Sequence, residues 1–312
     1  MALGLKRFSF QALSSYCEIQ IYDQSRINAK KTTQQLASEI LRIEKKYSLT
    51  NKNNFLLEIN QSAGSKFGIK LDAETRNLFG IAKQSFDQSS GASDITAAKL
   101  NNIWKASAQE RPDKRVLDQL KPLIGFEKLE LRGSRLYLPS GMEIDFGPIL
   151  KEYATDAAAQ LAKNLNITHG LINLGGDFAV IGPQPGDKPW TIGVANPEEE
   201  NSLLAKIEVL EGGVASAGDF SRCVNINDKN YNTFVNAKTR WLCMGLRAAT
   251  VASHLCTQAG SLARTALSLD ESDGLRKLEQ ESFKFAAMKE DGQIQGKSAE
   301  IKLGFTSQLC VL

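Results

Sequence analysis

The chain has 312 residues, of which 42% are hydrophobic and 23% charged, and its formal net charge is +3. This length and apolar content predict a globular protein with a buried core, and the lack of a low-complexity linker predicts a single compact domain over residues 1–312. The small net charge and the lack of a dense lysine and arginine stripe argue against nucleic acid as a partner.

The five cysteines are odd in number and none of them shows CxxC spacing. They predict buried or free thiols and not a disulfide framework. No window reaches the roughly 18 consecutive apolar residues of a transmembrane helix. Residues 1–10 lack the apolar core of a signal peptide, so we expect either a cytoplasmic protein or one whose leader has been removed.

The first predicted element is a strand at Glu18–Tyr22, where polar and apolar residues alternate as in an edge or half-buried strand. Apolar residues at helical spacing then predict an amphipathic helix over about 28–47. Residues 72–88 read as a second helix. Residues 129–139 read as a pair of strands around a Gly-Ser turn.

A third helix is predicted to begin near Pro148, because proline suits the first helical position. A hairpin follows at 173–182. Three further strands and a last long helix are predicted at 190–194, 204–210, 214–217 and about 251–269, the helix with Leu255, Leu262, Ala266 and Leu269 on its apolar face. This mixture predicts an α+β fold, with helices packed on a largely antiparallel sheet.

The hairpin carries the sequence NLGGDFAVIG from Asn173 to Gly182. A glycine pair lets backbone amides approach a ligand, and Asn173 and Asp177 flank it as polar handles. A plain hairpin turn has the same signature, so both interpretations remain open at this point.

Two other positions suit the binding of an anion. Lys151 falls in the first turn of the helix that begins near Pro148, where the helix dipole and free N–H groups attract phosphate. The alternative is an ordinary surface lysine. Ser216, Gly218 and Asp219 form a turn that brings together a hydroxyl, an open backbone and a carboxylate, although an ordinary turn has the same composition.

Taken in order, the clusters at 91–96, 144–156, 173–182 and 214–222 resemble the ApbE family, the FAD:protein FMN transferases, over about residues 9–295. The resemblance implies a T-fold-related α+β protein that binds FAD and, with Mg²⁺, moves FMN onto a Thr or Ser of an acceptor protein, releasing AMP. The positions that it implies for cofactor binding are Asp94, Lys151, Asp156, Asn173, Gly175, Gly176, Asp177, Ser216 (in place of threonine), Gly218 and Asp219.

The sequence departs from the family pattern at its catalytic positions. Thr233 stands at the family's histidine and Asn236 at its aspartate, and neither side chain acts as a general base near neutral pH. The catalytic residues are therefore left unassigned. The two histidines of the chain, His169 and His254, are expected to be structural, the second at the start of the last helix.

The family's metal-binding helix presents Asp and Thr four residues apart on one face. These positions align with Gly260 and Arg264 or, one residue further on, with Ser261 and Thr265. Neither register supplies the carboxylate that Mg²⁺ prefers. The remaining metal candidates are the main-chain carbonyl of Leu150 and the hydroxyl of Thr265, so the implied Mg²⁺ site is incomplete.

In the first register Arg264 lies where the family holds its metal, and its guanidinium is suited to bind a pyrophosphate in place of the cation. The alternative is an exposed helix residue. Two functions follow: a divergent FMN transferase with an acceptor protein, or an inactive homologue that binds FAD or another protein. The resemblance also implies a periplasmic location, although no signal peptide or lipobox is visible.

Overall fold

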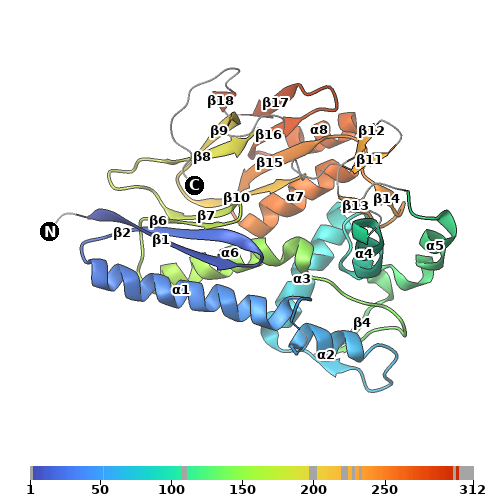
Figure 1. The fold of residues 1–312 in the computed structure, drawn as a ribbon. Helices are drawn as coiled ribbons and strands as arrows, with labels where there is room; N and C mark the ends of the chain where they lie inside the picture. The colour runs from blue at the N-terminus through green and yellow to red at the C-terminus, as the bar shows by residue number, and fades with distance from the viewer. Residues whose placement is uncertain are drawn as a thin grey trace.

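The computed structural model describes residues 3–51, 53–106, 111–196, 202–218, 224–226, 229–231, 234–297 and 300–301. Its centre is an eight-stranded sheet in the order β1-β2-β6-β7-β10-β15-β16-β17 (Figure 1). Every neighbouring pair in this sheet is antiparallel, which confirms the predicted architecture. Its strands are β1 (Gly4–Ala12), β2 (Ser15–Asp23), β6 (Gly170–Leu174), β7 (Asp177–Gly182), β10 (Gly212–Ala217), β15 (Ala248–Ser253), β16 (Lys284–Met288) and β17 (Ile294–Lys297).

Three helices cover one face of the sheet. Helix α1 (Arg26–Tyr47) packs on β1 and β2, α6 (Gly147–Asn164) on β6 and β7, and α7 (Cys256–Ser268) on β10 and β15. Neighbouring helices in this layer also touch each other, which places α6 between the other two. The remaining helices are α2 (Phe55–Gln61), α3 (Ala73–Gln88), α4 (Ala98–Ala106), α5 (Lys114–Gln119) and α8 (Glu271–Gln280), with 3₁₀ turns at Ile95–Ala97, Lys121–Leu123 and Phe126–Lys128.

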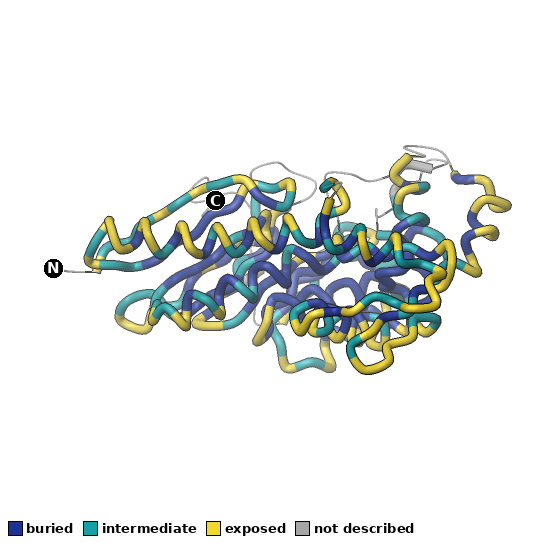
Figure 2. The backbone as a smooth tube through the Cα atoms, turned by 90° about the horizontal axis from the view of Figure 1, so that it is seen from below, coloured by how far each residue is buried: buried dark blue, intermediate teal, exposed yellow. Residues whose placement is uncertain are grey.

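A second, smaller sheet, formed by β18, β9 and β8, covers the other face. Side chains such as Trp190 and Ile192 pack there against Leu171 and Val180 of the central sheet. The central strands are therefore buried on both sides (Figure 2). The small sheets have the orders β18-β9-β8, β3-β5-β4, β11-β12 and β13-β14, with bounds β3 (Ile69–Lys70), β4 (Glu130–Arg132), β5 (Arg135–Tyr137), β8 (Trp190–Ala195), β9 (Leu203–Val209), β11 (Val224–Ile226), β12 (Lys229–Tyr231), β13 (Val235–Asn236), β14 (Trp241–Leu242) and β18 (Glu300–Ile301).

Burial on both faces explains two errors of the sequence analysis. Strand β2 is neither an edge strand nor half-buried: it lies between β1 and β6, and its polar residues Glu18 and Gln20 are buried and bonded to each other. The helix predicted from residue 251 begins instead at Cys256, because the preceding residues form β15. A strand buried on both faces shows no alternation that would separate it from a helix.

The predicted end of α7 near residue 269 agrees with its end at Ser268, but its first residues were predicted incorrectly. Leu255 is 53% exposed and lies outside the helix, so it is not part of the apolar face. His254 precedes α7 and does not open it, and α8 follows as a further helix.

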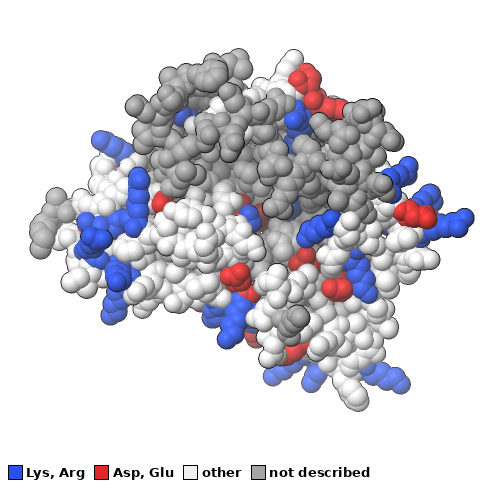
Figure 3. Space-filling model, viewed as in Figure 1, with Lys and Arg blue, Asp and Glu red and all other residues white. Residues whose placement is uncertain are grey.

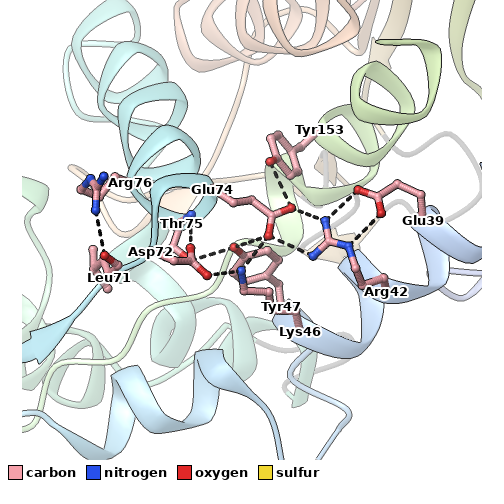
Figure 4. Close-up of polar contacts among 10 residues, drawn as sticks. All are labelled: Glu39, Arg42, Lys46, Tyr47, Leu71, Asp72, Glu74, Thr75, Arg76 and Tyr153. Atoms are coloured by element: carbon pink, nitrogen blue, oxygen red, sulfur yellow. Dashed lines mark hydrogen bonds and ion pairs between the residues drawn. The ribbon is translucent and has the colours of Figure 1, made fainter. Parts of the chain in front are cut away.

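A network of ion pairs joins α1, α3 and α6 (Figure 4). Glu74 of α3 accepts hydrogen bonds from Arg42 and Lys46 of α1, the second at 2.6 Å, and from the Tyr153 hydroxyl of α6 at 3.4 Å. Lys46 also bonds Asp72, which caps α3. These contacts hold the first half of α6 against α1 and α3.

The remaining general expectations concern thiols, charge and the membrane. Cys17, Cys243 and Cys256 are free and buried, as predicted. Basic side chains on the face seen in Figure 3 form separate groups with acidic ones between them. None of the described helices combines the length and the apolar character needed to cross a bilayer.

Candidate functional site

A cavity of about 1680 Å³ opens where the N-terminal end of α6 meets α1, α4, β10 and α7. This is larger than the roughly 300–1,000 Å³ of an ordinary small-molecule pocket, so it has room for an extended ligand. Of the residues singled out in the sequence, its wall contains Asp94, Leu150, Lys151, Asp177, Ser216, Gly218 and Arg264.

The glycine turn between β6 and β7 lies beside this cavity. Gly175 and Gly176 have φ angles of +62° and +94°, the left-handed pair of a tight hairpin. A Cβ atom on Gly175 would lie 2.6 Å from the Ser15 side chain and 3.7 Å from Nζ of Lys151. The Asn173 side chain accepts a hydrogen bond of 2.9 Å from the amide of Gly176. Position 175 therefore requires glycine, both because of its positive φ angle and because a side chain there would meet Ser15.

Lys151 is a cation of the cavity wall that solvent reaches. It lies near the N-terminus of the 18-residue helix α6, where the helix dipole favours an anion. Its ammonium group is 3.7 Å from Oδ2 of Asp177, and its side chain is 37% exposed. The lysine is thus not an ordinary surface residue, because it forms part of the cavity wall.

Asp177 follows the glycine turn and is almost buried. Burial raises the pKa of its carboxyl to about 7, and the neighbouring charge of Glu152 acts in the same direction, while Lys151 lowers it. The group therefore changes its charge close to neutral pH.

Arg264 is buried and not exposed, which overturns the surface alternative. Its Nη1 and Nη2 atoms bond the two carboxylate oxygens of Glu152 on α6, the second at 2.9 Å. Burial lowers the pKa of Arg264, but the Glu152 carboxylate outweighs burial and raises it, so the guanidinium stays charged. The two side chains form a forked ion pair between α6 and α7.

The sequence profile of the ApbE family matches residues 13–288. The chain belongs to the ApbE family. It is 23% identical to an FAD:protein FMN transferase of Haemophilus influenzae, over 74% of this chain and 70% of the relative. It is also 23% identical to one of Vibrio cholerae, over 82% and 79%.

Solved structures of this family share the fold. The ApbE protein of Thermotoga maritima superimposes with a TM-score of 0.84 at 24% identity, covering 94% of this chain and 96% of that one. The flavinyl transferase ApbE of Pseudomonas stutzeri gives 0.83 at 21% identity and 95% of each chain. These likenesses confirm the predicted ApbE-like α+β fold.

Several residues implied by the ApbE resemblance are bonded to the protein itself. Asp156 points at α7 and accepts from the amides of Cys256 and Thr257, at 2.8 and 2.9 Å, and from the Thr257 hydroxyl. Both oxygens of Asp94, although it lies in the cavity wall, accept from Thr96 and from the amide of Phe126. These two carboxylates hold the site together.

Side chains at other expected site positions also form hydrogen bonds within the protein. The Asn236 side chain accepts from the amides of Lys238 and Thr239 and so closes a turn. The Thr265 hydroxyl donates to the carbonyl of Ser261 within α7. The Ser216 hydroxyl shares a 2.8 Å hydrogen bond with Thr250 on the next strand. Asp219 and Thr233 lie outside the described residues.

The sequence analysis missed the role of Glu152. The family resemblance places Glu152 at a glycine position, next to Lys151, and Gly260 at an aspartate position, and the sequence alone showed no contact between the two. One turn of α7 separates Gly260 from Arg264, so both face α6. A large acidic residue at Glu152 together with the smallest residue at Gly260 could have indicated that the two positions are in contact.

Proposed function

We propose that this chain binds FAD in the cavity, with the pyrophosphate against Lys151 and the Gly175–Gly176 turn. The observation that carries the proposal is the position of the Lys151 ammonium, beside a glycine turn and near the N-terminus of α6. A positive helix end, a lysine and open backbone together suit a phosphate group. Membership of the ApbE family and the FAD in the relatives' names support the choice of ligand.

The size of the cavity supports a dinucleotide in particular. A phosphate at Lys151 leaves space toward α4 and β13, where Trp104, Phe234 and Leu242 form part of the wall. Apolar and aromatic side chains of this kind suit a flat ring system. We therefore infer that the ring of the flavin or of the adenine occupies this end.

FAD titration of the purified chain, followed by quenching of flavin fluorescence, tests the proposal. Lys151→Ala is expected to weaken binding by about tenfold or more, since one charged contact to a phosphate is lost. Lys163→Ala, at the other end of α6, removes an equal charge and is expected to leave the affinity unchanged. An absence of FAD binding, or equal affinities for Lys151→Ala and the wild type, would contradict the proposal.

Transfer of FMN to an acceptor protein is the second candidate function, and the names of the relatives favour it. The experiment that separates it from binding alone is incubation with FAD, Mg²⁺ and a protein that carries an acceptor threonine motif. Flavin fluorescence on the denatured acceptor would select transfer. A yellow protein that leaves the acceptor unlabelled would select FAD binding without transfer.

A further inference from the structure

The family resemblance implies Mg²⁺ bound at α7, and the described side chains of this region do not suit it. Mg²⁺ takes oxygen ligands, carboxylates above all. Gly260 offers none, and the Thr265 hydroxyl is bonded within its own helix at 2.9 Å. Asp156 is bonded by the N-terminus of α7. In the part of the chain that the structure describes, no group of three or more His, Cys, Asp or Glu residues could hold a metal ion.

The space that a metal-binding side chain would need on α7 is also filled. A Cβ atom built on Gly260 would lie 1.9 Å from Oε1 of Glu152. Real side chains cannot come so close, so residue 260 has to be glycine while Glu152 keeps this position. The carboxylate of the site is thus supplied by α6, one residue after Lys151, and not by α7.

We propose that the Glu152–Arg264 ion pair replaces the divalent cation of this site, so that the chain binds its nucleotide without a metal ion. The inference rests on the proposed binding of FAD. It explains three departures together, because Glu152, Gly260 and Arg264 form one contact between α6 and α7.

The charges near the ion pair support this assignment. Arg264 lies in the cavity wall with Lys151, Glu152 and Asp177. Each member of this buried pair neutralises the charge of the other, so the contact between the two helices needs no cation from solution. An incoming Mg²⁺ would have to displace the guanidinium from both oxygens of Glu152 and shed its own water, which it does reluctantly.

The first test uses the wild-type chain alone. Calorimetric titration with Mg²⁺ and with Mn²⁺, in the absence of FAD, is expected to show no site with a stoichiometry of one per chain. FAD affinity in EDTA is expected to equal that in Mg²⁺ within about twofold. A stoichiometric metal site, or a loss of FAD affinity of more than about tenfold in EDTA, would overturn the proposal. If the chain did not bind FAD at all, the metal titration would still decide this point.

The second test rebuilds the family's arrangement with Glu152→Gly, Gly260→Asp and Arg264→Thr in one chain. This variant is expected to gain a Mn²⁺ signal in calorimetry and in electron paramagnetic resonance, and to bind FAD more weakly in EDTA than in Mg²⁺. Gly80→Asp is the matched control, because it adds a carboxylate to an open position of α3. A folded triple variant that remains indifferent to metal would overturn the proposal, and the wild-type titration decides it if the variant does not fold.

Discussion

Asp177 is a single carboxyl whose charge changes near neutral pH in the wall of the proposed pyrophosphate site. Burial raises its pKa to about 7, with Glu152 acting in the same direction and Lys151 and Arg264 opposing it. Above this pH the carboxylate repels an anion and pairs with Lys151. We therefore expect FAD affinity to rise by about three- to tenfold as the pH falls from about 8 to about 6.

Asp177→Asn isolates this effect, because it removes the titrating charge and keeps a polar side chain of similar size. The variant is expected to bind FAD at high pH as tightly as the wild type does at low pH, with little slope between. The pyrophosphate of FAD stays ionised throughout this range, so the ligand does not contribute the slope. A wild-type affinity that falls on acidification would show that Asp177 does not set the charge of the site.

Gly260 tests the contact between α6 and α7 by a change of one methyl group. Gly260→Ala places a carbon atom 1.9 Å from the Glu152 carboxylate, so the buried ion pair has to move. We expect a loss of about 1–3 kcal/mol of stability, measured by urea unfolding.

Gly80→Ala is the matched control, because a Cβ atom there meets nothing within 4 Å. Alanine is the better helix former, so this control is expected to gain about 0.5–1 kcal/mol. A Gly260→Ala variant that was as stable as the control would show that Glu152 moves aside easily, and would weaken the case for a rigid pair.

At the scale of elements, the start of α7 depends on a residue of another helix. Its N-cap position is Leu255, which makes no side-chain capping bond. Asp156 of α6 accepts from the first amides of α7 instead. Asp156→Ala is expected to lower stability by about 1–2 kcal/mol, as the loss of a strong cap does.

Asp270→Ala is the comparison for this cap, because Asp270 caps α8 from an exposed position. Removal of the Asp270 side chain leaves the amide of Asp273 open to water. We expect the free energy of unfolding to fall by about 0.5–1 kcal/mol in the same assay. Equal costs for the two variants would contradict the view that the buried Asp156 bonds hold α7 in place.

The sequence predicted elements well where helical spacing or turn residues mark them, and poorly where a strand buried on both faces lacks such a mark. The apolar stripe of α1 and the Gly-Gly hairpin could be placed to within a few residues, because spacing and turn chemistry are local. Strand β15 could not be placed, because all six of its residues are buried and its sequence shows no alternation of polar and apolar residues. The Glu152–Arg264 pair was also hidden, because residues 112 positions apart in sequence meet only through the packing of two helices.

At the scale of the whole molecule, the network on Glu74 joins α3 to α1 and α6, two helices that line the cavity (Figure 4). Partial burial opposes ionisation of Glu74, but hydrogen bonds from Arg42 and Lys46 outweigh it and hold its pKa at about 2. This lies below the roughly 4.3 of an unfolded glutamate. The network therefore stabilises the fold above about pH 4 and loses this contribution as the pH falls through about 2.

Glu74→Gln should remove this dependence on acid. At neutral pH we expect the variant to be less stable by about 1–2 kcal/mol, a value reduced from the full pKa shift because the ion pairs are partly exposed to solvent. Between about pH 5 and about pH 2 its melting temperature should fall less steeply than that of the wild type. Glu211→Gln, which removes an exposed ion pair with Lys163, is the control and should leave the slope unchanged. If Glu74→Gln and the wild type lost stability in parallel on acidification, the network would not be what holds α1, α3 and α6 together at neutral pH.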